Sequence, residues 1–555
     1  MRSSITANLH NLKGIPMRKE IAEKQKKKMG NLYRDFIQLM IVGSITGIFA
    51  GVIVTLFNIL AHEGEAISRD VYAYVRANPV WIPLLVLALA LAAFMLGVAV
   101  QISRAIGGCG IPQAEGATRG SIRFKWYRDI TAMFAASLLS IFMGLSIGTE
   151  GPSVFIGACA GDGVSSMLRR NQMIRKYQIT GGACTGLAVA SNAPLTGMAF
   201  AFEEAHKRFT PEVFICSFSS VVFGMLTRTA IYHALHKEIH SSFHSYVFHE
   251  MPVSSYGFVL LAGIVCGLMG VLFYKLCFRV RKLFMKIKQH DKRFRPVFRI
   301  CVAVLLGGLV SFVATGVMGG GHDLIESLGT HGGLSAPTTE AAFGASLVLT
   351  LAIVLVLKFF ITTVNVGAGV PCGIFIPIIA IGACLGGLLN SLWVKMGMDA
   401  QYCDLMVMIC MAAFFTTIIK APITSIIMIC EFTGSFAPLL PVIIAVSTGY
   451  IIGEMFRTDG IYEELLEVYE HENGIHERAR KEVYVLSVAM GAIADKREVR
   501  DVLWPAGARV TEISRGEELI LPEGDTILHG GDVLTIVCRT DEPAKIRDEL
   551  THILG

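Results

Sequence analysis

Apolar runs separated by short polar segments dominate the first 460 residues of the chain. Stretches of about 18 residues or more with few or no charges lie at 36–62, 79–102, 129–149, 211–231, 252–274, 300–320, 341–366, 372–394 and 402–419. A helix of this length crosses the roughly 30 Å hydrocarbon core of a bilayer. The pattern therefore predicts an all-α polytopic membrane protein.

Composition and charge support this prediction and orient the chain. Only 17% of the residues are charged, against about 25% in a typical soluble domain. The net charge of +5 collects in the N-terminal segment 1–34, in 118–128 and in 275–299, whereas 232–251 has few charges. Basic loops stay in the cytoplasm, so both termini are expected inside and the loop outside. Beside so many spans, basic clusters indicate contact with the lipid surface rather than nucleic-acid binding.

The apolar region contains a repeat. The sequence "APLT" at 193–196 corresponds to "APIT" at 421–424, and Glu203 corresponds to Glu431 at the same offset. The first half, 35–235, begins inside; a His-rich loop, 236–251, follows outside; and the second half, 252–460, therefore begins outside. The halves are predicted to be inverted. Inverted repeats with broken helices are typical of transporters that bind their substrate between the halves.

Glycine and proline interrupt the apolar runs at corresponding places: 107–112, 148–152, 193–197, 367–377 and 421–422. Proline disfavours helix at the preceding residue and suits a first helical turn, so helices are expected to start there. The unpaired backbone N–H groups of several such helix starts, aimed at one point, bind an anion without lysine or arginine. Partial charges also let a permeating ion leave.

A carboxylate, Glu150, lies in one of these interruptions. Ionisable groups inside a membrane are costly and mark function. We expect Glu150 to occupy the anion site when it is ionised and to leave when it is protonated. A neutral, hydrogen-bonded structural acid is the other interpretation.

Three motifs resemble those of the CLC family of chloride channels and chloride/proton antiporters. The family motifs GSGIP, G(K/R)EGP and GxFxP correspond to "GCGIP" (108–112), "GTEGP" (148–152) and "GIFIP" (373–377). Their order and spacing match, and the resemblance covers about 35–460. It implies the inverted-repeat CLC fold and a homodimer with one pore in each subunit.

The resemblance also implies roles for individual residues. Glu150 would be the outer gate that carries the proton, and Glu204 the inner glutamate that passes protons to the cytoplasm. Glu115 matches a structural acid. The anion-binding positions would be Cys109, Gly110, Glu150, Gly151, Ile374, Phe375 and Phe436.

Three departures from the family pattern affect these expectations. Cys109 replaces the serine of GSGIP, and Phe436, five residues before Pro441, stands where we expect the family's tyrosine. A thiol is a poor donor and a phenyl ring is none, and a hydrogen bond to a charged group is worth about 1.5–3 kcal/mol. We therefore expect weaker central anion binding and looser proton coupling. Thr149 removes the usual basic residue beside the gate. The unaltered GxFxP motif favours chloride over fluoride, and the absence of proline at Cys109 disfavours nitrate.

Glu150 and Glu204 together favour chloride/proton exchange, with no cofactor besides the transported chloride. A passive chloride channel, or an uncoupled and less selective anion transporter, remains the alternative. A metal-cation transporter is a distant one, suggested by His233, His236, His240, His244 and His249. An enzyme is not expected, because the spans hold no Ser/His pair and no pair of aspartates for catalysis.

The last part of the chain differs in character. After a charged linker, 461–482, short alternating segments and a final amphipathic helix predict a soluble α+β domain at 483–555. It resembles the C-terminal lobe of RCK domains, called TrkA-C, and the combination is expected of a bacterial protein in the cell membrane. Such lobes bind small ligands, often nucleotides. Arg509, Arg515 and His529 are the candidate phosphate contacts, and a dimerisation module without ligand is the alternative.

Overall fold

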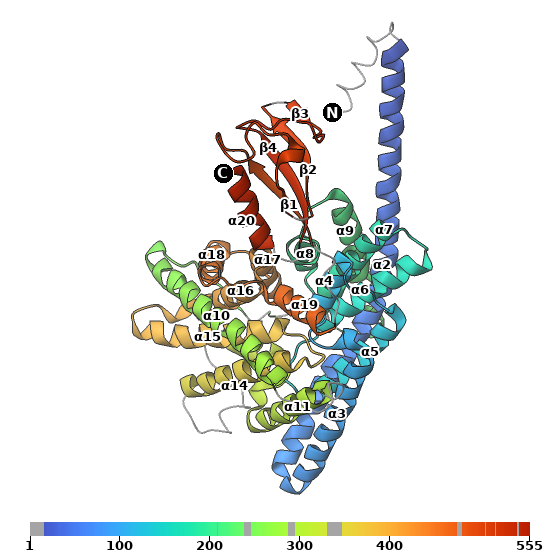
Figure 1. The fold of residues 1–555 in the computed structure, drawn as a ribbon. Coiled ribbons are helices and arrows are strands. Elements are labelled where there is room, and N and C mark those ends of the chain that lie inside the picture. The colour runs from blue at the N-terminus through green and yellow to red at the C-terminus, as the bar shows by residue number, and fades with distance from the viewer. Residues whose placement is uncertain are drawn as a thin grey trace. The chain divides into compact units, whose positions relative to one another are not determined.

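A computed structural model describes residues 16–207, 209–237, 243, 246–286, 295–329, 347–473, 480–505, 507–516, 518–540 and 543–555. The chain forms two compact units, Met1–Glu467 and Val468–Gly555, which Figure 1 colours from blue to orange and in red. The division falls inside the predicted linker 461–482. Each unit is described by itself.

The first unit is helical throughout the part of it that the structure describes. Its α-helices are α2 (Pro16–Ala77), α3 (Ile82–Ile102), α4 (Ile111–Arg119), α5 (Trp126–Phe142), α6 (Glu150–Met167), α7 (Gln172–Ser191), α8 (Pro194–Phe200), α9 (Pro211–Ala234), α10 (Tyr256–Lys286), α11 (Arg295–Val313), α12 (His322–Leu328), α14 (Leu347–Ala368), α15 (Phe375–Lys395), α16 (Cys403–Ile419), α17 (Pro422–Thr433), α18 (Leu439–Met455) and α19 (Ile461–Glu472). A short π-helix, η3 (Ala201–Ala205), continues α8.

Within the described residues, 8 helices are long and apolar enough to cross a membrane. They match the predicted runs except 129–149, where α5 has 17 residues. The predicted all-α membrane fold is confirmed. Five helices, α4, α6, α8, α15 and α17, begin at the five Gly-Pro interruptions.

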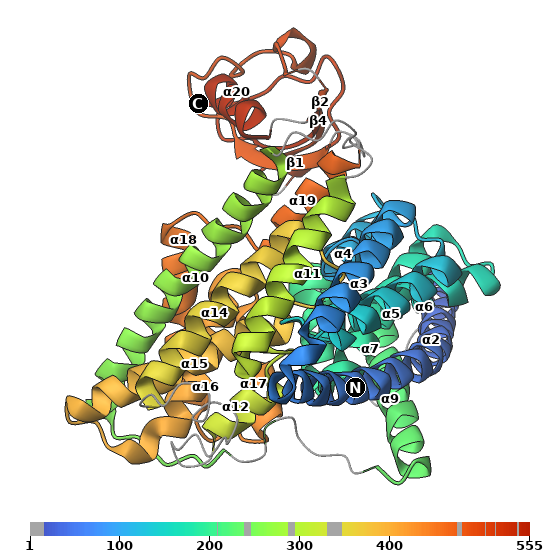
Figure 2. The ribbon, with the colours of Figure 1, turned by 90° about the horizontal axis from the view of Figure 1, so that it is seen from below.

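The centre of this unit is packed backbone to backbone. Every residue of α16 is buried, and α6 and α7 touch through glycines: a Cβ on Gly157 would meet the carbonyl oxygen of Gly182 at 2.1 Å. Small residues permit such close approach between membrane helices. Figure 2 shows α5, α6 and α7 side by side on one side of this unit and α14, α15 and α16 on the other.

The two repeat glutamates hold the two halves together reciprocally. The carboxylate of Glu203 accepts hydrogen bonds from the backbone N–H groups of Ile423 and Thr424, at 2.9 and 2.6 Å, in the first turn of α17. The carboxylate of Glu431 accepts from those of Leu195 and Thr196, at 2.8 and 2.7 Å, in the first turn of α8. Each glutamate therefore satisfies the free helix N-terminus of the other half.

We expect Glu431→Ala to lower the free energy of unfolding by about 1.5–3 kcal/mol, because hydrogen bonds to a charged group are lost and two N–H groups are left without an acceptor. Thermal melting of the purified protein in detergent measures this. Glu454→Ala is the control, because Glu454 makes an exposed ion pair with Lys420, and such pairs contribute about 0–1 kcal/mol. Equal melting temperatures for both variants would contradict the capping role.

The second unit is a small α+β fold, as predicted. Its strands β1 (Arg480–Ser487), β2 (Ala508–Arg515), β3 (Glu518–Ile520) and β4 (Val533–Thr540) form one sheet in the order β1-β4-β2-β3, with antiparallel neighbours. Helix α20 (Pro543–Leu554) contributes Leu550 and Leu554 to a core with Ile513 and Ile536.

Candidate anion and proton site

Three loops far apart in the sequence meet in the first unit. Gly148 and Gly373 exchange two backbone hydrogen bonds, at 2.8 and 3.0 Å, and the N–H of Cys372 donates to the carbonyl oxygen of Gly108 at 3.3 Å. The loops are the Gly-Pro interruptions that carry the three predicted motifs. The structure therefore brings all three motifs to one place.

Each of these loops ends where a helix begins: α4 at Ile111, α6 at Glu150 and α15 at Phe375. The close approach demands glycine. Gly110 has φ +89°, and a Cβ there would meet the Gly151 carbonyl oxygen at 2.8 Å. The predicted anion-site residues Cys109, Gly110, Glu150, Gly151, Ile374 and Phe375 thus come together, and all of them are buried. Converging first-turn N–H groups make this centre suitable for an anion.

Glu150 is fully buried at the first position of α6, with 0% exposure. Its Oε1 lies 3.5 Å from the Thr149 hydroxyl and 3.8 Å from Nε2 of His322. Its Oε2 has no hydrogen-bond partner among the described residues. The carboxyl group therefore makes fewer and longer hydrogen bonds than buried polar groups usually do. Such weak contacts suit a side chain that moves.

Sequence reasoning missed two basic side chains in this region, of which His322 is the one in contact with Glu150. Lys358 is fully buried on α14, and its Nζ donates to the Ser146 hydroxyl at 3.3 Å and to the carbonyls of Val317 and Gly319 at 3.2 Å. His322 begins α12. The signal for Lys358 was available, because a lysine inside an apolar run of membrane length is a functional candidate.

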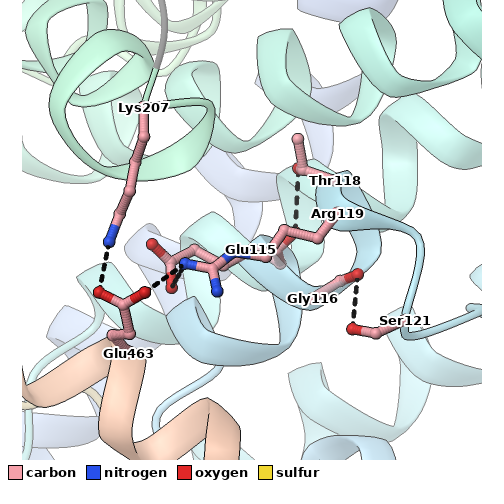
Figure 3. A network of polar contacts seen from close by, with 8 residues as sticks. Glu115, Gly116, Thr118, Arg119, Ser121, Lys207 and Glu463 are labelled. Carbon is pink, nitrogen blue, oxygen red and sulfur yellow. Dashed lines mark hydrogen bonds and ion pairs between the residues drawn. The ribbon is translucent and has the colours of Figure 1, made fainter. Parts of the chain in front are cut away.

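Glu204 lies in the π-helix segment η3 and is 5% exposed. Its carboxyl group interacts with that of Glu115, which is also buried, and with Lys207. Lys207 in turn pairs with Glu463 at 2.9 Å, and Arg119 pairs with the other oxygen of Glu463 at 3.1 Å. Figure 3 shows Glu463 between the two cations, with Glu115 beside Arg119.

The structure does not bring Phe436 to this centre. Phe436 lies on the turn between α17 and α18, and its side chain is 53% exposed. Tyr462, in the first turn of α19, is 1% exposed, and its hydroxyl interacts electrostatically with Cys109, Glu150 and Glu204. That hydroxyl has no hydrogen-bond partner among the described residues. A buried phenol therefore lies near this centre, and it comes from α19 and not from position 436.

A sequence signal for Tyr462 existed. Ile461, Tyr462, Leu465 and Leu466 are all buried, and their spacing is that of an apolar helix stripe. The stripe lies within the charged segment 461–482 and has no fixed spacing from Pro441.

The other predicted sites lie in the second unit and in the His-rich loop. In the second unit, Arg515 is already engaged: its guanidinium donates to both carboxylate oxygens of Asp532, each at 2.8 Å, which lowers the pKa of that carboxyl. In the outer loop, His240 and His244 lie outside the described residues. The part of the chain that the structure describes contains no group of three or more His, Cys, Asp or Glu side chains that could hold a metal ion.

Comparisons with known proteins find relatives of both units. A family model described as Voltage gated chloride channel matches residues 91–454, and a TrkA-C domain model matches residues 483–551. The H(+)/Cl(-) exchange transporter ClcA of Vibrio cholerae serotype O1 is 27% identical over 443 residues, covering 77% of this chain and 89% of that protein. A transporter of the same name from Yersinia pestis is 28% identical over 368 residues, covering 65% and 72%.

Solved structures show the same fold. A slow cyanobacterial Cl−/H+ antiporter aligns with a TM-score of 0.69 and 21% identity over 80% of this chain and 99% of that one. A CLC-type fluoride/proton antiporter aligns with a TM-score of 0.59 and 19% identity over 77% of this chain and 97% of that one. Since the first family model matches more than half of the sequence, the chain belongs to the voltage-gated chloride channel family, also called the CLC family, and carries a C-terminal TrkA-C domain.

Proposed function

We propose that this chain is a chloride/proton antiporter. The observation that carries the proposal is the position of Glu150, a fully buried carboxylate at the point where the starts of α4, α6 and α15 converge. An ionised Glu150 and a chloride ion compete for the same N–H groups. A proton on Glu150 removes its charge and its competition, so that binding of the proton and binding of the anion are coupled.

The central chloride is held by backbone N–H groups at Ile374 and Phe375, and the outer one by those near Glu150 and Gly151. The ring of Phe375 packs edge-on against Phe415, with centroids 4.7 Å apart, which fixes the first turn of α15. The Tyr462 hydroxyl donates to the central ion, and the Cys109 thiol is a weaker second donor. With Tyr462 present, only one of the two donors that we expected to lose is weakened.

Glu204 transfers protons between Glu150 and the cytoplasm. It is buried beside a second carboxyl group, Glu115, and near Lys207. Opposite charge favours the ionised form of Glu204, whereas burial and like charge favour the protonated form. Burial and the neighbouring carboxyl groups outweigh Lys207 and raise the pKa of Glu204 well above its ordinary value, so that this side chain can hold a proton, as an intermediate carrier requires.

The names of the Vibrio and Yersinia relatives support chloride and protons as the exchanged ions. The chain would work as a homodimer in the cell membrane with both termini in the cytoplasm, following its basic segments. It would need no cofactor. The TrkA-C domain would bind a small ligand, a nucleotide being one candidate, or serve in dimerisation.

Purified protein in liposomes tests the proposal. A chloride gradient should drive protons against their own gradient, with chloride followed by an electrode and protons by a pH dye. Chloride flux without proton movement would instead identify a passive channel. The absence of both fluxes, in liposomes where protein insertion has been verified, would overturn anion transport.

A further inference from the structure

A second set of titratable side chains lies on the predicted outer side of Glu150. The exposure of these side chains decreases step by step toward Glu150. His62 on α2 is exposed, the side chain of His322 is 27% exposed, and that of Glu150 is 0% exposed. The rings of His62 and His322 have centroids 6.1 Å apart. Nε2 of His322 lies 3.8 Å from Oε1 of Glu150. The three side chains thus form a series from the solvent to the buried acid.

His62 does not face the lipid. The lipid-facing stripe of α2 contains the exposed side chains of Leu56, Leu60, Ile67 and Val71, which recur at helical spacing. His62 lies on the other side of the helix, where the charges that act on it come from His322, Glu150, Arg228 and Lys237. The exposed side chain of His62 therefore lies among polar and charged groups and not on the apolar stripe.

We propose that His322 is the proton donor and acceptor that connects Glu150 with the external solution, and that His62 feeds it. This inference rests on the proposed function. In the inward step, the N–H bond at Nε2 of the His322 imidazolium breaks and an O–H bond forms on Glu150, which leaves a neutral imidazole and a neutral acid. Water or His62 then returns a proton to His322. The step involves no electron transfer and needs no other reactant.

The distances suit a gated transfer. At 3.8 Å the Nε2–Oε1 separation is slightly too long for a hydrogen bond, so the proton passes when Glu150 moves toward His322. The 6.1 Å between the centroids of the two rings is short enough for a proton to pass between them directly or through one water. Imidazole is the side chain whose ordinary titration lies nearest neutral pH, which makes it an efficient shuttle there.

Other charged groups surround the pair and set its titration. His322 is also acted on by Glu65 of α2 and Lys358 of α14, while Asp323 beside it is paired with Arg69. Phe243, from the predicted outer loop, covers the His322 ring at 5.8 Å between centroids. Phe243 is thus an apolar neighbour of His322, whereas His62 is an exposed imidazole beside it and offers a route for protons from the solvent.

The test compares His322→Ala and His322→Gln with the native protein in the liposome assay, at saturating chloride and over a range of external pH. Native proton flux should fall as external pH rises through the histidine range. Both variants should lose about tenfold or more of the flux, as expected when a proton-transfer group is removed. Glutamine preserves size and polarity but carries no proton, so a flux maintained by His322→Gln would show a positioning role and overturn the relay.

Chemical rescue separates proton transfer from misfolding. Free histidine added outside supplies an imidazole that can enter the space left by His322→Ala and should restore proton flux, whereas alanine at the same concentration should not. His249→Ala, the same change at an exposed position of the outer loop, should behave as the native protein. Loss of flux in both His322 variants, with no recovery of His322→Ala by free histidine, would count against the relay.

The outcomes also separate this inference from the function on which it rests. A native protein that conducts chloride without protons overturns the exchange. A native protein that exchanges normally, with both His322 variants unaffected at every external pH, overturns only the relay.

Discussion

Glu150→Gln is expected to stop proton movement completely while chloride continues to cross the membrane. Glutamine has nearly the shape of the protonated acid, so it cannot ionise, cannot carry a proton and does not compete with chloride for the N–H groups at the start of α6. The flux of chloride should also lose its dependence on external pH, because the group that titrates is gone.

Liposomes in which both ions are recorded measure this result. Glu250→Gln is the matched control, since it makes the same chemical change at an exposed position of the loop predicted to lie outside and should leave exchange intact. A Glu150→Gln protein that still moves protons uphill would refute the role of Glu150 and, with it, the proposed mechanism.

Glu204→Gln should also abolish proton transport but leave a different residual activity. Glu150 is intact in this variant and still exchanges protons with the outside, so chloride flux should keep its dependence on external pH. The two variants are therefore distinguishable even though neither pumps protons. This difference assigns Glu150 to the outer half of the proton route and Glu204 to the inner half.

The neighbouring residue provides the control for Glu204. Glu203→Gln is the same substitution one position earlier in the chain. The carboxylate of Glu203 accepts hydrogen bonds from backbone N–H groups of α17, and glutamine keeps one acceptor oxygen there. Glu203→Gln should therefore retain exchange. Equal losses in the two variants would mean that this segment acts through its structure rather than through the proton on Glu204.

The parts of the site that were predictable from the sequence are those fixed by local backbone chemistry. Glycine and proline determine where helices begin, so the starts of α4, α6, α8, α15 and α17 could be located. The repeat then indicated that these starts belong to one arrangement. The meeting of Cys109, Glu150 and Phe375 was implied by the resemblance of their motifs to those of the CLC family.

The parts that were missed depend on tertiary packing. The prediction that Phe436 lies at the anion site depends on its spacing from Pro441. The two residues are joined through the connection between α17 and α18, and such connections vary in length and path. Tyr462 reaches the centre because α19 packs into the first unit through its apolar stripe. His322 of α12 lies beside Glu150, and Lys358 of α14 bonds Ser146 in the loop before α6. No spacing in the sequence relates either residue to position 150.

The crossed contacts of Glu203 and Glu431 have a consequence for how this architecture arose. Each half contains one helix N-terminus whose backbone N–H groups donate to a glutamate of the other half, so neither half satisfies these groups alone. A shorter ancestor with a single half could have made both contacts only by pairing two identical copies in opposite orientations. Fusion of the duplicated gene would then have placed both halves in one polypeptide. The interface between them would no longer have depended on the association of two separate molecules.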